Sequence, residues 1–209
     1  MKDPILLVKC GTTDPPIVAE CGDYDDWFRN HLALHQRESR TVRPYLGETL
    51  PAPTAFAGVM VTGSPLSVRD EAPWMEETGT WILQTASLGV PVLAVCFGLQ
   101  LTIEALGGRV DTNPNGREVG SIKVELTESG LRDPLFKGLP ACTSFFATHA
   151  DAVTRAPSHP YLTALAGNPN TAWQAFGFGN HLRAVQFHPE MTMNGMQTLL
   201  RCRGLTAHV

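Results

Sequence analysis

The sequence lacks the features that mark a membrane protein, an exported protein or a nucleic-acid-binding protein. No apolar run reaches the roughly 18 residues that a transmembrane helix needs. The apolar stretch within residues 1–10 is too short for a signal peptide, and no cleavage pattern follows it. The 209 residues carry a net charge of −4 without a block of basic residues. We therefore expect neither nucleic acid nor a membrane as a partner.

Cysteines are few and widely scattered. Their odd number, wide spacing and lack of a CxxC pair argue against a disulfide framework and a zinc site, and favour a reducing, cytoplasmic setting. The sequence also lacks the GxSxG pattern of serine hydrolases and the Walker A pattern of phosphate-binding loops. Residues 177–182, GFGNHL, have no third glycine, so we expect a hairpin turn instead of a dinucleotide loop. No metal and no cofactor are expected. The five cysteines are Cys10, Cys21, Cys96, Cys142 and Cys202.

Apolar segments alternate with helical patterns through the first half of the chain. Asp23 can cap a helix, and acidic residues just after it suit the positive end of the helix dipole. Strands that alternate with helices favour a parallel sheet with right-handed crossovers. The expected strands are 5–10, 56–63 and 92–95, with a further strand and loop over 40–51, and the expected helices are 23–34, 72–89 and the segment after Cys96.

The second half of the sequence has a different texture. Short β-rich segments with polar gaps follow Gly108, and only the last segment, around 194–202, has a helical pattern. This half should add antiparallel strands. The length suits one domain. We therefore expect a single α/β domain over residues 1–209, with a mostly parallel central sheet, helices on both faces and extra antiparallel strands.

Cys96 lies between the buried strand 92–95 and the helix that follows. Ala94 and Gly98 lie two residues before and two residues after it, the offsets at which a nucleophile elbow needs small side chains. A thiol at the start of a helix faces backbone dipoles that favour the thiolate. The N–H of Phe97 would point to the same place, as one donor of an oxyanion hole. A buried structural cysteine is the alternative that this stretch leaves open.

A candidate general base lies in AVQFHPEMT, residues 184–192. Val185 and Phe187 alternate with His188, and residues two apart in an extended chain share a face. Pro189 favours extended geometry at His188. His188 and Glu190 can therefore face the same way, so that one ring nitrogen serves the thiol while Glu190 orients the other. An ordinary edge-strand histidine is the alternative.

Four segments together resemble the class I, or triad, glutamine amidotransferases, and in particular the glutaminase part of GMP synthetase. GVPVLAVCFGLQLTIEALGG (89–108) resembles the strand–elbow–helix signature of that family, and AVQFHPEMT (184–192) resembles its His-x-Glu signature. VTGSPLSV (61–68) resembles its oxyanion loop, and THADAV (148–153) resembles the segment beside the substrate. The order and spacing of the four segments fit the family over most of the chain. The resemblance implies the flavodoxin-like fold of these enzymes.

The resemblance also implies roles for individual residues. The sequence departs from the family pattern at two places. Ser64 replaces a second glycine before the proline, and Thr148 and Ala150 replace the serine and the glycine of the usual Ser-His-Gly-Asp. His149 is expected to shape the substrate pocket instead of acting as a second catalytic histidine. The implied catalytic residues are Cys96, His188 and Glu190, the oxyanion-hole residues are Gly63, Ser64 and Phe97, and the substrate-binding residues are Gln100, Thr148, His149, Ala150 and Asp151.

The expected reaction is hydrolysis of the side-chain amide of glutamine to glutamate and ammonia, through a γ-glutamyl thioester. Amidotransferases pass ammonia to a synthetase, and 209 residues without a nucleotide motif leave no room for one. A separate synthetase subunit is therefore an expected partner. The alternative is a stand-alone γ-glutamyl hydrolase or peptidase that acts on another γ-glutamyl small molecule. A non-enzymatic binding module is a third reading, against which the intact Cys96, His188 and Glu190 argue.

Overall fold

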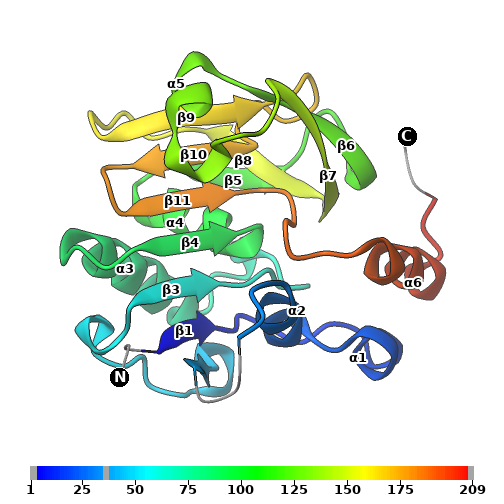
Figure 1. The fold of residues 1–209 in the computed structure, drawn as a ribbon, viewed down its shortest axis with the longest axis horizontal. Coiled ribbons are helices and arrows are strands. Elements are labelled where there is room, and N and C mark those ends of the chain that lie inside the picture. The colour runs from blue at the N-terminus through cyan, green and yellow to red at the C-terminus, as the bar shows by residue number, and fades with distance from the viewer. Residues whose placement is uncertain (1–3, 35–37, 207–209) are drawn as a thin grey trace.

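A nine-stranded mixed sheet runs through the centre of the molecule (Figure 1). The computed structural model describes residues 4–34 and 38–206. Five neighbouring strands are parallel, and the remaining four extend the sheet in antiparallel pairs. In spatial order the strands are β2 (Ser39–Val42), β1 (Ile5–Val8), β3 (Gly58–Val61), β4 (Val92–Val95), β11 (Leu182–Val185), β10 (Ala175–Phe178), β9 (Leu162–Gly167), β6 (Glu118–Leu126) and β7 (Cys142–His149).

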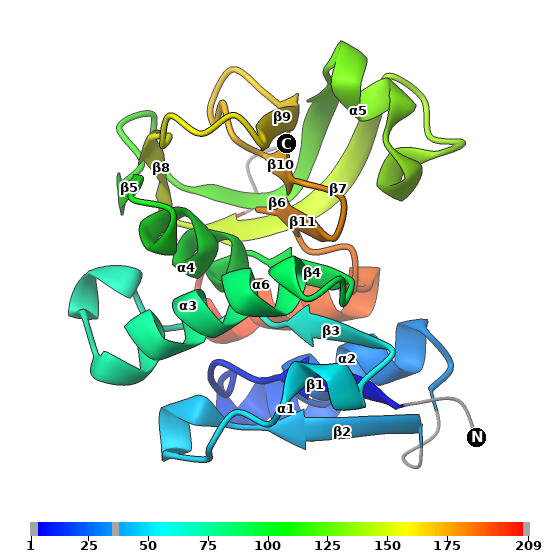
Figure 2. The ribbon, with the colours of Figure 1, turned by 90° about the vertical axis from the view of Figure 1, so that its left-hand side faces the viewer.

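Helices cover both faces of the parallel half. On one face α3 (Pro73–Ser87) and α4 (Phe97–Ala105) pack against each other, as Figure 2 shows. The other face carries α2 (Tyr24–His31), and beyond it α1 (Pro15–Cys21) packs against α6 (Met193–Arg203). A short helix, α5 (Glu128–Arg132), packs on β9. No helix within the described ranges is both long and apolar enough to cross a membrane.

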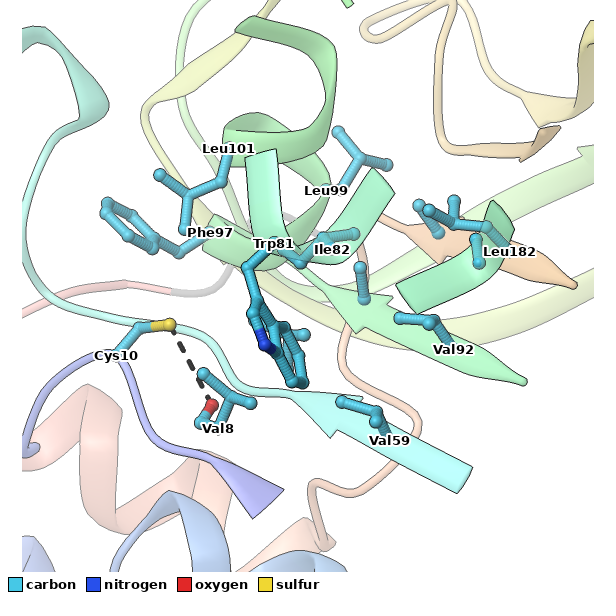
Figure 3. Close-up of a cluster of buried hydrophobic side chains, with 14 of the residues drawn as sticks. Val8, Cys10, Val59, Trp81, Ile82, Val92, Phe97, Leu99, Leu101 and Leu182 are labelled. Carbon is cyan, nitrogen blue, oxygen red and sulfur yellow. Dashed lines mark hydrogen bonds between the residues drawn. The ribbon is translucent and has the colours of Figure 1, made fainter. Parts of the chain in front are cut away.

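The alternation of side chains along β1 explains why both faces need cover. Leu6 and Val8 join the core beneath α3 and α4, whereas Leu7 joins the core on the opposite face with Phe28 of α2. All three strand residues are fully buried. Successive strand residues point to opposite faces, so an unbroken apolar strand is stable only between two layers. Figure 3 shows the core under α3, where Trp81 and Ile82 lie over the sheet strands.

The expected α/β fold is confirmed, and its elements form close to the expected ranges. The helix expected over 23–34 begins after Asp23, which caps it. Residues 177–182 form the turn region of the β10–β11 hairpin, as predicted. The expected extra antiparallel strands include β5 (Arg109–Thr112) and β8 (Asp151–Arg155), which form a separate two-stranded sheet. That residues 1–209 form one domain stays a prediction.

The short helices α1 and α5 are not indicated by the sequence pattern. Pro15 and Pro16 occupy the first turn of α1, where proline is compatible with a helix because its missing N–H would have had no partner there. Two successive prolines are equally typical of a loop, and seven residues are too few for a clear period. Only packing against α6 identifies the segment as a helix.

Lys9 joins the end of β1 to the start of α2. Its Nζ lies 2.7 Å from Oδ2 of Asp23 and 2.9 Å from Oδ1 of Asp25, and all three side chains are buried. Burial by itself would lower the pKa of Lys9, but the two carboxylates raise it above its ordinary value. Arg29 makes a further ion pair with Asp25 at 2.9 Å. This cluster fixes α2 on the sheet close to the carboxyl ends of the parallel strands.

Glu118, at the start of β6, accepts hydrogen bonds that tie together several segments. Its Oε2 accepts from Thr171 Oγ1 at 2.6 Å and from Gln174 Nε2 at 2.7 Å, and its Oε1 accepts from Asn168 Nδ2 at 2.7 Å. His149 Nε2, at the end of β7, lies 3.1 Å from Oε2. Burial alone would raise the pKa of Glu118, but its hydrogen bonds, led by the one from His149, lower it to about 2.

We predict that Lys9→Met destabilises the protein, because it leaves Asp23 and Asp25 buried beside an apolar side chain. The expected loss in the free energy of unfolding is about 3–5 kcal/mol, measured by urea denaturation. Arg43→Met is the control, since Arg43 pairs with Glu48 at the surface and should lose less than about 1 kcal/mol. Equal losses in the two variants would contradict the prediction.

We predict that Glu118 makes the stability of the protein sensitive to acid. A carboxylate whose folded pKa is depressed contributes stability above its unfolded pKa, near 4.5, and loses it as the pH falls towards about 2. Glu118→Gln should therefore be less stable than wild type by about 3 kcal/mol at pH 7, and the gap should shrink between pH 4.5 and 3. Urea unfolding across this range measures the gap. Glu125→Gln, which changes an exposed carboxylate on the same strand, is the control, and a gap for Glu118→Gln that is independent of pH would argue against this assignment.

Candidate active site

Cys96 occupies a sharp turn between β4 and α4. Its backbone angles are φ 51° and ψ −100°. Residues other than glycine adopt this conformation at an energetic cost, and it is typical of strained functional turns. The backbone N–H of Cys96 donates to the carbonyl of Val185 at 2.7 Å, which holds the turn against β11. A Cβ at Gly98 would come within 3.1 Å of the backbone oxygen of Val61, so a small residue is needed there for α4 to approach β3. Ala94 is fully buried.

His188 and Glu190 lie just beyond the end of β11. The Nδ1 of His188 is 2.7 Å from Oε1 of Glu190, and both side chains are buried, with 3% and 2% of their surfaces exposed. The backbone N–H of His188 donates to the carbonyl of Phe146 at 2.7 Å. Within the described residues Nε2 of His188 has no hydrogen-bond partner. The ring is therefore held at one nitrogen and free at the other.

The three segments that carry Cys96, His188 and Gly63 meet at one place. A Cβ built on Gly63 would lie 2.9 Å from Cε1 of His188 and 3.7 Å from Cβ of Cys96. This follows from strand order, because β3, β4 and β11 are parallel neighbours and their carboxyl ends share one edge of the sheet. Glycine at position 63 leaves room for the imidazole ring.

Electrostatics favour a protonated imidazole at this place. Burial alone would lower the pKa of His188, but the charges of Glu190 and Cys96 and the hydrogen bond to Glu190 raise it to about 10. His188 therefore carries a proton at neutral pH that it can give to a leaving group, and Glu190 stabilises the charged ring.

The candidate oxyanion-hole residues come from two loops of the same edge. Phe97 is the first residue of α4, and its ring stacks on Trp74 with centroids 5.9 Å apart. The carbonyl of Gly63 accepts from the Thr62 hydroxyl at 2.8 Å. The hydroxyl of Ser64 accepts from the N–H of Leu66 at 3.1 Å, so this side chain holds the turn of its own loop.

Of the expected substrate-binding residues, Gln100, His149 and Asp151 come together. The backbone carbonyl of Asp151 lies 3.2 Å from Nε2 of Gln100, which donates to it, and 3.0 Å from Nδ1 of His149. The carboxylate of Asp151 is turned towards another loop, where Ser67 Oγ donates to it at 2.7 Å and Arg69 pairs with it at 3.2 Å.

Thr148 and Ala150, the other expected substrate-binding residues, make backbone contacts. Thr148 pairs with Val119 in the β6–β7 ladder. The carbonyl of Ala150 accepts from the N–H of Asn113 at 2.8 Å. These contacts hold the segment 148–151 against β6 and against Asn113, just after β5.

The structure adds polar residues that the sequence analysis does not single out. Gln186 is fully buried, and its Nε2 lies 3.4 Å from Sγ of Cys96. The alternation in AVQFHPE was the available signal, since it places Gln186 on the same face as His188. Glu118 gives no such signal, because its partners come from other segments. The described part of the chain holds no group of three or more His, Cys, Asp or Glu side chains arranged for a metal ion.

Comparison with known proteins matches the chain to a family model and to curated relatives. The family model for glutamine amidotransferase class-I matches residues 27–203. The glutamine-hydrolysing GMP synthase of Thermomicrobium roseum is 35% identical over 174 residues, which are 79% of this chain and 31% of that protein. The GMP synthase of Aeropyrum pernix is 36% identical over 157 residues, which are 74% of this chain and 28% of that protein. The chain thus spans about a third of the length of these relatives.

Solved structures share the fold. A glutamine amidotransferase from Methylobacillus flagellatus aligns with a TM-score of 0.78 at 21% identity, covering 98% of this chain and 77% of that one. A glutamine amidotransferase from Thermotoga maritima aligns with a TM-score of 0.76 at 18% identity, covering 98% and 84%. With the match to the family model over most of its length, the chain belongs to the class-I glutamine amidotransferase family and is an enzyme of that family.

Proposed function

We propose that the chain hydrolyses the side-chain amide of glutamine, with Cys96, His188 and Glu190 as its catalytic triad. The observation that carries the proposal is the placement of His188, which is bound to buried Glu190 at 2.7 Å and lies at the elbow that presents Cys96. A nucleophile, a base and an orienting carboxylate in this order are the parts that acyl transfer requires.

The reaction proceeds in two halves. The sulfur of Cys96 attacks the side-chain carbonyl carbon of glutamine, and His188 gives its proton to the departing nitrogen, so that ammonia leaves and a γ-glutamyl thioester remains. His188 then takes a proton from water, whose oxygen attacks the thioester. Glutamate leaves, and the sulfur of Cys96 is restored. Glu190 keeps the ring in position and stabilises its charged form.

Two backbone N–H groups would hold the developing oxyanion. Phe97 supplies one from the start of α4, and the main chain of Ser64 supplies the other, with Gly63 leaving space for His188. The engagement of the Ser64 hydroxyl with Leu66 supports a role for the backbone at this position. Substrate glutamine would lie against Gln100 and the segment formed by Thr148, His149, Ala150 and Asp151.

We further propose that the ammonia passes to a separate synthetase partner, in a cytoplasmic setting. Relatives that hydrolyse glutamine as GMP synthases are about three times as long as the matched region. Their remaining length is where an acceptor reaction would take place. A stand-alone γ-glutamyl hydrolase is the competing function, because Ser64, Thr148 and Ala150 depart from the usual pattern around the substrate.

We predict that the purified chain releases ammonia and glutamate from glutamine and that Cys96→Ala abolishes this activity. Glu190→Gln should lower kcat, but by less than Cys96→Ala does, because the carboxylate acts through His188. The double variant should be no worse than Cys96→Ala alone, since triad members act as a unit. The measurement is release of ammonia, amine and glutamate from a panel of γ-glutamyl compounds, with Cys10→Ala as the control.

The panel also separates the two functions. Slow turnover of glutamine that a co-purifying synthetase accelerates supports the amidotransferase subunit. Turnover of another γ-glutamyl compound at about 1 per second or faster without a partner would support the stand-alone hydrolase instead.

We predict that Ser64 acts through its backbone. Ser64→Ala keeps the N–H and should retain nearly full activity, whereas Ser64→Pro removes the N–H and should lower kcat on the order of 100-fold or more. Both variants should be checked for folding by circular dichroism before kcat is compared. A large loss in Ser64→Ala would assign the role to the hydroxyl, and a folded Ser64→Pro with normal kcat would place the second donor elsewhere.

A further inference from the structure

A chain of buried amide groups leads from the backbone of β8 to the sulfur of Cys96. Nε2 of Gln100 donates to the carbonyl of Asp151 at 3.2 Å and to Oε1 of Gln186 at 3.4 Å. Nε2 of Gln186 then donates to Sγ of Cys96 at 3.4 Å. Gln100 is 4% exposed and Gln186 is fully buried, so water does not compete for these contacts. The triad mechanism gives Gln186 no role.

The carbonyl of Asp151, at the end of this chain of amide groups, fixes the direction of every hydrogen bond in it. A backbone carbonyl can only accept, so Asp151 requires the amino group of Gln100 to face it. That amino group also faces Gln186, which must therefore present its oxygen to Gln100. The amino group of Gln186 is then left to face Cys96. With Gln100 turned over, two acceptors would meet at the carbonyl of Asp151, and with Gln186 turned over, two amino groups would meet between the glutamines. Either mismatch is costly in a buried site.

Gln186 is held in place at its backbone and, through Gln100, at its side-chain oxygen. Its backbone N–H donates to the carbonyl of Gln174 at 2.8 Å, and its neighbours Val185 and Phe187 are buried in the core. The carbonyl of Asp151 at the far end also lies 3.0 Å from Nδ1 of His149. The donor that points at the sulfur is thus preorganised by the fold and needs no rearrangement when charge appears there.

We propose that Gln186 is a catalytic hydrogen-bond donor that stabilises negative charge on the sulfur of Cys96, and that Gln100 is the positioning residue that sets its orientation. The proposal rests on the proposed function of Cys96 as nucleophile. A thiolate accepts a hydrogen bond more strongly than a thiol does. The donor therefore favours the sulfur anion before attack, and again when the thioester breaks and the sulfur leaves. Since both amino hydrogens of Gln100 are engaged, this residue offers only its oxygen to a substrate.

Few other titratable groups face the sulfur within the described residues. His188, backed by Glu190, is one, and Tyr24 of α2 is another. Burial raises the pKa of Tyr24 above its ordinary value of 10.0, so its hydroxyl stays neutral over the range in which cysteine alkylation is measured. A change that follows from Gln186 is therefore separable from the tyrosine.

The test is the pH dependence of the rate at which iodoacetamide alkylates Cys96, followed by peptide mapping so that the other cysteines do not contribute. Gln186→Met keeps the size of the side chain and removes the donor, and the midpoint of the rate–pH curve should rise by about one unit. Gln186→Glu keeps the shape and places an oxygen at the sulfur, so its midpoint should rise further. Gln174→Met removes a neighbouring, equally buried glutamine that bonds Glu118 instead, and should leave the midpoint where wild type has it. A wild-type midpoint in folded Gln186→Met would overturn the proposal.

A second measurement needs no substitution. In the wild-type protein the side-chain NH2 resonance of Gln186 should shift with pH at the midpoint found by alkylation, and this shift should vanish once Cys96 carries the acetamide group. A resonance that does not respond to either change would overturn the proposal. Neither measurement uses glutamine. If the protein shows both effects but releases no ammonia from glutamine, only the proposed function is contradicted. If it releases ammonia but shows neither effect, only this inference is contradicted.

Discussion

The parallel pairing of β4 with β11 is the contact on which the rest of the site depends. Val95 lies opposite Val185 in this ladder, and the next residue, Cys96, donates its N–H to the same Val185 carbonyl. The strained turn at Cys96 is therefore anchored by the strand that carries His188 three residues later. Because the strands are parallel, both functional segments leave the sheet at the same edge. Cys96 and His188 therefore come together although about ninety residues separate them in sequence.

Burial strengthens the electrostatic interactions between the polar groups of the site. The side chains of Cys96, His188 and Glu190 are almost fully enclosed, so the charges of Glu190 and His188 interact through a poorly screening medium. In such surroundings an unpaired polar group is costly. Three of the buried groups can only accept hydrogen bonds: the carboxylates of Glu190 and Glu118 and the carbonyl of Asp151. These acceptors fix the orientation of the amide groups and imidazole rings that face them.

The local parts of the site were predictable because they follow short-range rules. Small residues on either side of Cys96 predict the elbow, and the alternation of Phe187 with His188 predicts a histidine and a glutamate on one face. The structure has the elbow at Cys96 and the bond between His188 and Glu190. Gln186 and Glu118 were not found in the same way. A buried glutamine or glutamate resembles an exposed one in sequence until its partners are known.

The sequence by itself determined most of the strands and helices, the residue types of the proposed triad and the family to which the chain belongs, because each is encoded in neighbouring residues or in short motifs. Only the tertiary structure decided the order of the strands, the separate β5–β8 sheet and the amide chain from Asp151 through Gln100 and Gln186 to Cys96. These depend on contacts between segments far apart in the chain. Such contacts are selected by the packing of the whole core and by the cost of leaving buried donors and acceptors unpaired, which no local pattern records.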